Sequence, residues 1–429
     1  MSAPVARKLL ERREQALGAG AQLFYTEPLH IVRGDGVELF DADGRRYIDM
    51  YNNVPCVGHG NARVADAMAA QQATLNVHSR YLHEGIVSFA ERLVALHHDG
   101  IESAVISCSG TEAVEVGLRM ARLATGQRGV IATDATYHGN SEAVIALTLA
   151  AREPEAHPDL ATIPFPQRFR PIEDGLDDAE LADAYLDQLA AAIGHLEESG
   201  HGVAAIILCS ILANEGLPDI PGDFMARASQ MVRDAGGLVI ADEVQAGYCR
   251  TGRWWGYEVT GFEPDIAVMG KPMGNGLPLS ATVASREIVE GFRTRTRHFN
   301  TFAASPLQAA VGHAVIDEIE QRGLASSVSE IGRNLKAALV DRAVGCSWIG
   351  DVRGHGLFIG VEMVSGKDLA PDRARAVEVT DRLKERGILA SNAGAFANVL
   401  KLRPPLVLQQ SHAEEFLSAF DAVLQELDG

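Results

Sequence analysis

The sequence predicts an α/β protein, with a mainly parallel sheet in one large domain and a smaller α+β domain after it. Three observations carry this prediction. Strand-like apolar runs alternate with helical stretches, which is typical of parallel sheets. Many of the 42 glycines directly follow apolar runs, as they do at strand-to-helix turns. The chain has 429 residues, of which 47% are hydrophobic, so it is long enough for more than one core.

The expected strands of the large domain are short and continuously apolar, as strands buried on both faces of a sheet are. The clearest is "GVAAIILCS" at 202–210, and the helical stretch "FMARASQMVRDAG" at 224–236 follows it. In chain order we expect strands at 103–107, 129–134, 202–210, 237–243 and 264–270, with a helix at 112–123 after the first.

The pattern changes near residue 305. Long helical patterns follow at 306–321, 324–343, 372–387 and 412–427, with short strands at 356–364 and 398–404 among them. Near the N-terminus, residues 31–50 are typical of hairpins, with the turn "DADG" at 41–44. We therefore predict three parts: an N-terminal segment, 1–55, that packs with the small domain; a large domain, 56–305; and a small C-terminal domain, 306–429.

Composition excludes several classes of partner. The net charge of −19 and the pI of about 5.2 disfavour nucleic acid and anionic membranes, which repel an acidic surface. The five cysteines have no CxxC spacing and form no zinc-like cluster with histidine, so we expect reduced thiols and no metal. The N-terminus lacks the apolar core of a secretory signal, and no apolar run approaches transmembrane length. These features predict a cytoplasmic protein without a nucleic-acid or membrane partner.

The stretch "DIAVMGKPMGNG" at 265–276 places Lys271 at the end of a predicted buried strand. Burying an ammonium group is costly, so most lysines at such positions reach solvent or pair with a carboxylate. The chemical alternative is an amine whose lowered pKa lets it attack a carbonyl group. The carboxyl edge of a parallel sheet is where α/β proteins bind ligands, and the nearby glycines allow a planar ligand to approach the backbone.

Further polar groups follow other predicted strands of the same domain. Asp242, in "GLVIADE", either caps the next turn or keeps a pyridinium nitrogen protonated. Ser109, Gly110 and Thr111 precede a predicted helix, where they either cap it or hold an anion with free N–H groups.

An aromatic side chain completes the pattern. Tyr137 stands in "TYHGNS", and His138 beside it is more typical of a pocket wall or a core hydrogen bond than of a metal ligand. An anion site, an aromatic ring, a carboxylate and a lysine thus occur in that order at predicted strand ends. Together they describe a pocket for pyridoxal phosphate, held as a Schiff base on Lys271.

These motifs resemble the class III aminotransferases, which are fold type I pyridoxal-phosphate enzymes, and the resemblance runs from about residue 23 to 427. It rests on "SGTEAVE", "YHGN", "ADEVQAGYCRTG", "PDIAVMGKPMGNGLPL", "FNTFAASP" and "LRPPL". It implies a mainly parallel seven-stranded sheet, and an obligate homodimer whose active sites lie between subunits. The resemblance also implies roles in cofactor binding. Lys271 forms the aldimine, Asp242 lies at the ring nitrogen and Gln245 lies near the ring hydroxyl, while Tyr137 (with His138 beside it) and Val244 cover the two ring faces. The phosphate is held by Ser109, Gly110 and Thr111, and Thr301 reaches it from the other subunit.

A narrower resemblance bears on the reaction. The stretches "NNVPCVGHG", "NVHSRYLHEGIV" and "GDVRGHGLFIGVEM" are similar to the branch that includes ethanolamine-phosphate phospho-lyases, which use the same cofactor to eliminate phosphate. The chain also departs from the wider family: Cys209-Ser210-Ile211 replaces Glu-Pro-Val, 303–306 replaces Gly-Gly-Asn-Pro, and Lys401 replaces an arginine that binds the substrate carboxylate in some members. The candidate substrate residues are Lys401, Asn53 and Arg80, and for Arg80 a surface position or a structural ion pair is an equal alternative.

We therefore predict a class III aminotransferase that moves an amino group from a primary amine or amino acid to a keto acid or aldehyde. The alternative is a phospho-lyase acting on phosphoethanolamine-like substrates, and the sequence alone leaves the choice open. A non-catalytic scaffold or regulator that kept the fold is a third reading, disfavoured by the presence of the lysine, the aspartate and the phosphate-site residues.

Overall fold

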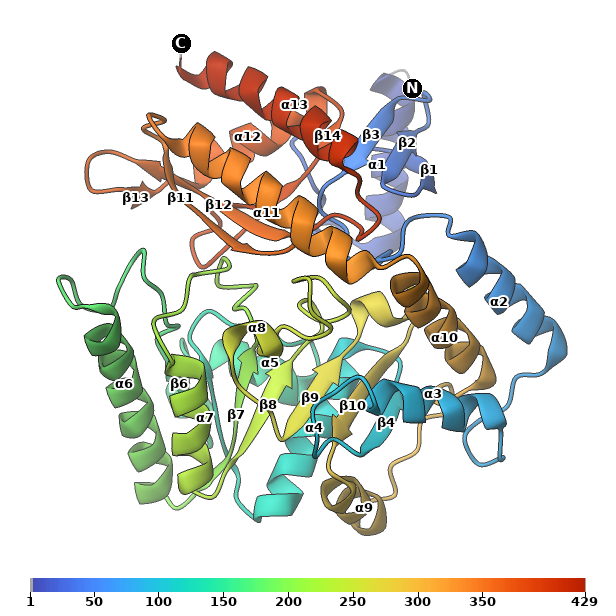
Figure 1. Cartoon of the computed structure of the whole chain (residues 1–429), viewed down its shortest axis with the longest axis vertical. Coiled ribbons are helices and arrows are strands. Elements are labelled where there is room, and N and C mark those ends of the chain that lie inside the picture. The colour runs from blue at the N-terminus through green and yellow to red at the C-terminus, as the bar shows by residue number, and fades with distance from the viewer. Residues whose placement is uncertain (1–2, 429) are drawn as a thin grey trace.

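The computed structural model describes residues 3–428, and its larger body is built on a seven-stranded sheet (Figure 1). The strands lie in the order β4-β10-β9-β8-β7-β5-β6; β10 runs antiparallel to both of its neighbours, and the pairs from β9 to β6 are parallel. Their bounds are β4 Ser103–Ser107, β5 Gly129–Thr133, β6 Leu160–Ile163, β7 Val203–Cys209, β8 Leu238–Asp242, β9 Ile266–Met269 and β10 Ser280–Ala284. The prediction of a mainly parallel α/β sheet is confirmed.

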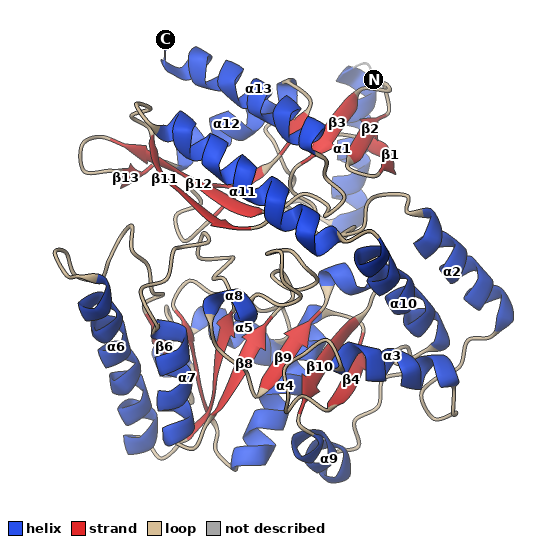
Figure 2. Cartoon of the chain, in the orientation of Figure 1, coloured by secondary structure: helices blue, strands red, loops and turns tan. Residues whose placement is uncertain are grey.

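Both faces of this sheet are covered, which explains why its strands are continuously apolar. Along β7, Ile206 and Leu208 pack into one hydrophobic cluster, whereas Ala205 and Ile207 pack into a second. Figure 2 shows α6 and α7 on the near side of the sheet and α4 on the far side. The helices next to the sheet are α4 Gly110–Thr125, α5 Glu142–Leu149, α6 Asp178–Glu198, α7 Phe224–Asp234 and α9 Arg286–Arg295.

The smaller body contains an antiparallel sheet covered by long helices. Its strand order is β11-β12-β16-β15, with β13 paired to β12. The bounds are β11 Ile349–His355, β12 Phe358–Ser365, β13 Ala370–Pro371, β15 Ser391–Ala393, β16 Val399–Leu402, α11 Leu324–Ala343, α12 Arg373–Glu385 and α13 Gln410–Asp428. The helical patterns predicted at 306–321, 324–343, 372–387 and 412–427 correspond to α10 Pro306–Gln321, α11, α12 and α13. The strands were expected to be short, but β11 has 7 residues and β12 has 8.

The N-terminal hairpin joins this smaller body through a strand pair. The strands β1 Ile31–Asp35, β2 Glu38–Asp41 and β3 Arg46–Asp49 form a sheet with β14 Ile388–Leu389. β3 and β14 are parallel, with Ile48 opposite Ile388. The predicted turn at 41–44 connects β2 to β3.

The remaining elements are helices and short turns outside the three sheets. They are α1 Ala3–Leu17, α2 Ala62–Thr74, α3 Glu84–Val94, α8 Tyr257–Thr260, α10 Pro306–Gln321 and the short 3₁₀ turns η1 Pro154–Ala156 and η2 Lys271–Gly274. α10 begins at the predicted residue because Ser305 and Gln308 form a capping box and Pro306 fills the first turn. It packs against α2 and α3, so the division at 305/306 stays a prediction.

Two strands of the large sheet were missed by the sequence analysis. β10, "SATVA", consists mostly of small residues, and β6, "LATI", has only four residues. Neither strand contains a long apolar run like that of β7. β10 pairs with an antiparallel strand on each side, and β6 is an edge strand, so both depend on their neighbours in the sheet.

Across residues 3–428, no helix has both the length and the apolar character needed to cross a membrane.

Candidate active site

A cavity of about 350 Å³ lies at the carboxyl ends of β8 and β9, and Figure 1 shows these strand ends pointing toward the smaller body. Four residues predicted from the sequence line it: Lys271, Tyr137, Gln245 and Lys401. The rest of the lining is Tyr51, Asn214, Ala393, Gly394 and Arg403. Segments far apart in the sequence therefore meet at this edge of the sheet.

The amine of Lys271 has no hydrogen-bond acceptor among the described residues. Lys271 follows β9 after one residue, Gly270, and begins η2. Burial lowers the pKa of Lys271, and the negative charge of Asp242 opposes that shift. A partly buried lysine that is not paired with a carboxylate can present a neutral amine, as a nucleophile or a proton acceptor must.

Asp242 is held by hydrogen bonds at both of its carboxylate oxygens. Oδ1 accepts from the backbone N–H of Val244 at 3.0 Å, and Oδ2 lies 2.6 Å from Nδ1 of His138. Because a carboxylate only accepts, Nδ1 of His138 carries the proton, and Nε2 is left to face Oγ1 of Thr136 at 2.6 Å. The side chain of His138 is fully buried, so it acts here as a core hydrogen-bond partner that fixes the carboxylate.

Two more buried carboxylates lie around Asp242. Glu215 accepts from Oγ1 of Thr133 at 2.5 Å, and burial raises its pKa. Glu243 accepts from Oγ of Ser210 and from the backbone of residues 256 and 257, and burial raises the pKa of Glu243 to about 7. We call Asp242, Glu215 and Glu243 the carboxylate cluster. Each member has at least two hydrogen-bond donors.

The start of α4 leaves two backbone donors free. Oγ of Ser109 accepts from the N–H of Glu112, so Ser109 is an ordinary helix cap, which was the alternative reading of this residue. Within the described chain, the N–H groups of Gly110 and Thr111 have no acceptor. A Cβ added to Gly139 would lie 2.4 Å from Oγ1 of Thr111, so the loop after Tyr137 closes directly over the helix start.

Val244 packs against the same helix start. It is 6% exposed, and a Cβ on Gly110 would lie 3.0 Å from its Cγ1. The residues present fit pyridoxal phosphate by their chemistry. Free N–H groups and a hydroxyl at a helix start suit a phosphate, a fixed carboxylate suits a pyridinium nitrogen, and an unpaired amine suits an aldehyde.

Lys401 and Arg403 form what we call the cation pair. Nζ of Lys401 donates to the carbonyl of Ala213 at 2.7 Å and to Oε1 of Gln245 at 3.2 Å. Arg403 also donates to Oε1 of Gln245, at 2.5 Å, and its guanidinium lies 4.3 Å from the centre of the Tyr51 ring. In residues 3–428 the hydrogen-bond acceptors of both side chains are neutral, and burial lowers the pKa of Lys401 well below its usual range.

The sequence analysis missed Arg403, Asn214 and Tyr51. Arg403 had a detectable signal, because residues two apart on a strand share a face and "LKLRPPL" puts it two after Lys401. Asn214 had none, because it stands in the irregular stretch after β7.

Nine predicted residues are not part of the cavity lining. Six of them are described above: Asp242, His138, Val244, Ser109, Gly110 and Thr111. The other three are Arg80, Thr301 and Asn53. Arg80 is exposed and stacks on Phe299, with its guanidinium carbon 4.0 Å from the ring centre. Thr301 is exposed as well. Asn53 is 2% exposed, and its Nδ2 has no partner among the described residues. The roles expected of these residues remain predictions.

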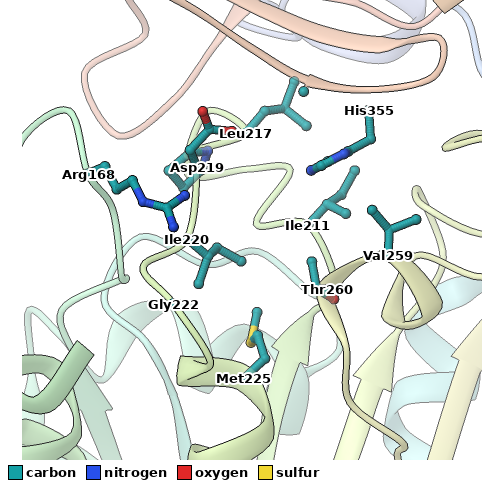
Figure 3. A pocket seen from close by; sticks show the side chains of 12 residues that line it. Arg168, Ile211, Leu217, Asp219, Ile220, Gly222, Met225, Val259, Thr260 and His355 are labelled. Carbon is teal, nitrogen blue, oxygen red and sulfur yellow. The ribbon is translucent and has the colours of Figure 1, made fainter. Parts of the chain in front are cut away.

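A second cavity, of about 260 Å³, lies beside the loop that follows β7 (Figure 3). Arg168, Asp219 and His355 provide its charged or ionisable lining, and Arg168 is paired with Asp178 at 2.6 Å. The remaining lining is largely apolar: Ile211, Leu217, Pro218, Ile220, Gly222, Met225, Val259, Thr260 and Gly354. None of the residues predicted to bind a cofactor lines this second cavity.

Comparison with known proteins identifies the family of the chain. The "Aminotransferase class-III" family profile matches residues 23–424. An alanine–glyoxylate aminotransferase 2-like protein of Drosophila melanogaster is 36% identical over 432 residues, which cover 97% of this chain and 87% of the fly protein.

Two solved structures share the fold over nearly the whole chain. One is a phospholyase from Arthrobacter in complex with phosphoethanolamine, with a TM-score of 0.93 and 38% identity over 97% of this chain and 99% of that one. The other is an amine transaminase from an uncultivated Pseudomonas species in its pyridoxal-phosphate-bound form, with a TM-score of 0.85 and 27% identity over 93% and 95% of the two chains. The chain therefore belongs to the class III aminotransferases, a family of pyridoxal-phosphate-dependent enzymes.

Proposed function

We propose that this enzyme is an aminotransferase that acts on a primary amine, with Lys271 as its catalytic lysine. One observation carries the proposal. The amine of Lys271 has no partner in the described chain and lines the cavity beside a hydrogen-bonded Asp242, while free N–H groups at the start of α4 provide an anion site. Both features are those that a pyridoxal-phosphate aminotransferase requires.

When bound, pyridoxal phosphate supplies an electron sink for negative charge that develops next to the substrate nitrogen. The chain supplies the rest. Nζ of Lys271 removes the proton from the carbon that bears the amine and returns it later. Asp242, oriented by His138, places a fixed negative charge where the ring nitrogen binds, and the amides of Gly110 and Thr111 hold the phosphate.

Phosphate elimination is the second candidate, and two observations favour it. The Arthrobacter phospholyase, 38% identical, is a complex with phosphoethanolamine. The cation pair also gives the cavity two basic side chains, and their hydrogen-bond acceptors in residues 3–428 are all neutral. Both reactions begin with the same proton removal by Lys271, so they differ in what leaves the substrate afterwards.

The holoenzyme can be tested with phosphoethanolamine alone and with amines plus pyruvate or glyoxylate. Consumption of amine that depends on the keto acid, without release of inorganic phosphate, supports the aminotransferase. Phosphate release without any keto acid reverses the order of the two candidates. The Lys271→Ala variant is the control for both assays, and it should be inactive in each.

We also propose a homodimer in which Thr301 serves the active site of the other subunit. Large exposed apolar side chains lie near Thr301 in sequence and along the 81–82 loop: Tyr81, Leu82, Phe299 and Phe302. Asn300 connects this surface to the start of α4 through Glu112. An apolar surface next to an anion site is what a shared active site needs.

Mixed dimers test this arrangement. Thr301→Glu should repel the cofactor phosphate and inactivate the enzyme, and Lys271→Ala should inactivate it as well. If Thr301 acts across the interface, dimers of one Lys271→Ala and one Thr301→Glu subunit contain one intact site, so that mixing the unfolded variants and refolding them recovers activity. No recovery despite dimer formation would place Thr301 in its own subunit's site or outside any site.

The five cysteines, all free thiols in the structure, support a reducing compartment, and we propose the cytoplasm. Cell fractionation with an antibody to the chain tests this location.

A further inference from the structure

The turn that follows β7 places Asn214 at the first cavity. We call residues 212–217 the β7 turn. Asn214 lines the cavity, and its Nδ2 donates to the carbonyl of Tyr137 at 2.8 Å. Glu215, the next residue, accepts from Oγ1 of Thr133 and from the N–H of Asn214. The position of Asn214 at the cavity therefore depends on what holds this turn.

The β7 turn contains two leucines in an unfavourable backbone conformation. Leu212 has a φ of +49° and Leu217 a φ of +60°, which lie in the left-handed region that residues with a Cβ avoid. Such residues stay in this conformation only where their surroundings hold them. One contact from outside the turn comes from Lys401, which donates to the carbonyl of Ala213 at 2.7 Å.

Arg353, on β11 of the smaller body, supplies a second contact. It is 2% exposed, and its Nε donates to the carbonyl of Gly216 at 3.0 Å. Nη1 donates to Asp351 at 2.9 Å, and Nη2 pairs with Glu362 at 2.6 Å. Because two carboxylates fix the planar guanidinium, Nε is held in one direction, toward the turn.

Glu362, on β12, extends these contacts to another segment of the larger body. Its Oε2 faces Arg353. Its Oε1 accepts from Nε of Arg170 at 2.8 Å and from Nδ2 of Asn398 at 3.2 Å. Arg170 lies between β6 and α6. We call Arg353 and Glu362 the buried ion pair. This pair belongs to the smaller body and bonds to two segments of the larger one.

Close backbone packing brings the smaller body onto the β7 turn. Gly216 has a φ of +108°, and an added Cβ would lie 3.0 Å from Cγ2 of Val399 on β16. A Cβ on Gly360 of β12 would lie 3.2 Å from the carbonyl oxygen of Gly216. Gly360 stands opposite Arg353 in the pairing of β11 with β12. The carbonyl that Arg353 binds is therefore also in contact with the neighbouring strand.

We propose that Arg353 is a positioning residue of the active site, which fixes the β7 turn and thereby the place of Asn214 at the cavity. Arg353 does not line the cavity, so it acts through the carbonyl of Gly216 and the backbone between Gly216 and Asn214. The inference rests on the proposed function only where it concerns the rate of reaction. The hold on the turn is a property of the folded chain and can be measured without turnover.

The competing role of the buried ion pair is purely structural. Removing one partner of a buried pair leaves the other charge unpaired and destabilises the fold. A loss of activity alone therefore does not separate the two roles. Two measurements do: the protection of the β7 turn from hydrogen exchange, and the coupling of Arg353 to Asn214.

Hydrogen–deuterium exchange of the holoenzyme follows the turn directly. Arg353→Met removes the bond to Gly216 but keeps an unbranched side chain. We expect exchange in a peptide spanning 210–218 to rise about tenfold, the effect of one lost hydrogen bond to a charged group. Arg353→Lys, which keeps the charge, should restore part of the protection. Arg342→Met is the matched control, because Arg342 pairs with Asp421 within the smaller body and should leave the turn unchanged. A rise that this control matches, or no rise in folded Arg353→Met, would overturn the proposal.

A second variant reaches the same contact without removing a charge. Gly360→Ala adds a Cβ that pushes against the carbonyl of Gly216. If Arg353→Met does not fold, the same rise in exchange is expected of Gly360→Ala, which then also replaces it in the coupling experiment. An unchanged turn in Gly360→Ala would in that case refute the hold on the turn. Gly291→Ala, on α9, is its control, since a Cβ there would meet only an ordinary contact at 3.5 Å.

Coupling to Asn214 is measured by the rate at which phosphoethanolamine or n-propylamine changes the cofactor absorbance. We expect Arg353→Met to lower kcat/KM about tenfold in the parent enzyme but less than about twofold in Asn214→Ala, because the side chain that Arg353 positions is then absent. The same factor in both backgrounds, or an unchanged kcat/KM in Arg353→Met, would refute the positioning role. If neither amine changes the absorbance of the parent enzyme, the proposed function fails, while the exchange experiment still tests whether Arg353 holds the turn.

Discussion

The carboxylate cluster and the cation pair are built in opposite ways, and only the cation pair lines the cavity. Asp242, Glu215 and Glu243 each accept at least two hydrogen bonds from within the chain. Lys401 and Arg403 have only neutral acceptors in residues 3–428. A fully bonded cluster is rigid and holds one charge in place, whereas an uncompensated pair is ready for a charge that arrives and leaves. The comparison suggests that the first region serves a resident group and the second a transient one.

Removing the lysine between these regions should have the largest effect. Lys271→Ala leaves both regions intact but removes the only proton acceptor that we assign to the reaction, so kcat should fall by about 10⁴-fold. Steady-state kinetics on protein loaded with pyridoxal phosphate measure this. Lys367→Ala, at an exposed lysine, is the control and should retain full activity.

Neutralising Asp242 of the carboxylate cluster should have the second-largest effect on activity. Asp242→Asn keeps the shape but removes the negative charge that we propose faces the ring nitrogen, and it deprives His138 of its anionic acceptor. We expect kcat to fall by about 10³-fold with a small change in KM. If KM rose instead while kcat held, Asp242 would be binding substrate, and the assignment of the cluster to the resident cofactor would be wrong.

The pH dependence of stability reports on Glu243. Burial raises the pKa of Glu243 from 4.5 to about 7 in the folded chain, so the folded state keeps this proton to higher pH than the unfolded state does. The free energy of unfolding should therefore fall as pH rises from about 4.5 through 7, by about 3 kcal/mol in total, and stay low above that range.

Urea unfolding at a series of pH values measures this slope. Glu243→Gln should be less stable at low pH, because an amide cannot accept all three hydrogen bonds, but its slope across this range should be flatter. An unchanged slope in the variant would show that another group titrates.

The smallest effect is expected at the loop that carries Tyr137 and His138. Gly139 has a φ of +151°, and an added Cβ would push against Thr111. Gly139→Ala should weaken pyridoxal phosphate about tenfold by opening the contact between this loop and the start of α4. Gly194→Ala, in α6 with open space around it, is the matched control and should leave cofactor affinity unchanged. Equilibrium titration of the apoenzyme compares them.

The sequence predicted the elements that bury a continuous apolar run or a strong helical period, such as β7 and α10. It missed β10, because this strand consists mostly of small residues and gives no apolar run. Pairing with a strand on each side stabilises it in the sheet. Lys271, Gln245 and Tyr137 could be placed in one pocket because strand ends and family motifs mark them.

The rest of the site depends on distant segments. Nothing local in the sequence around Asn214 shows that its amide bridges Tyr137 and Gln245, because that contact exists only after three loops meet. For the same reason the sequence could not show that Arg80 stacks on Phe299 and stays outside the cavity.

The pairing of β3 with β14 can form only late in the synthesis of the chain. Ile48 leaves the ribosome early, but its partner Ile388 follows only when most of the chain has been made. Until then β3 is an unpaired edge strand of the N-terminal hairpin, and a chaperone or a strand from another chain can bind to it. The four-stranded N-terminal sheet is therefore complete only after β14 has been synthesised, whatever the β-propensity of its first three strands.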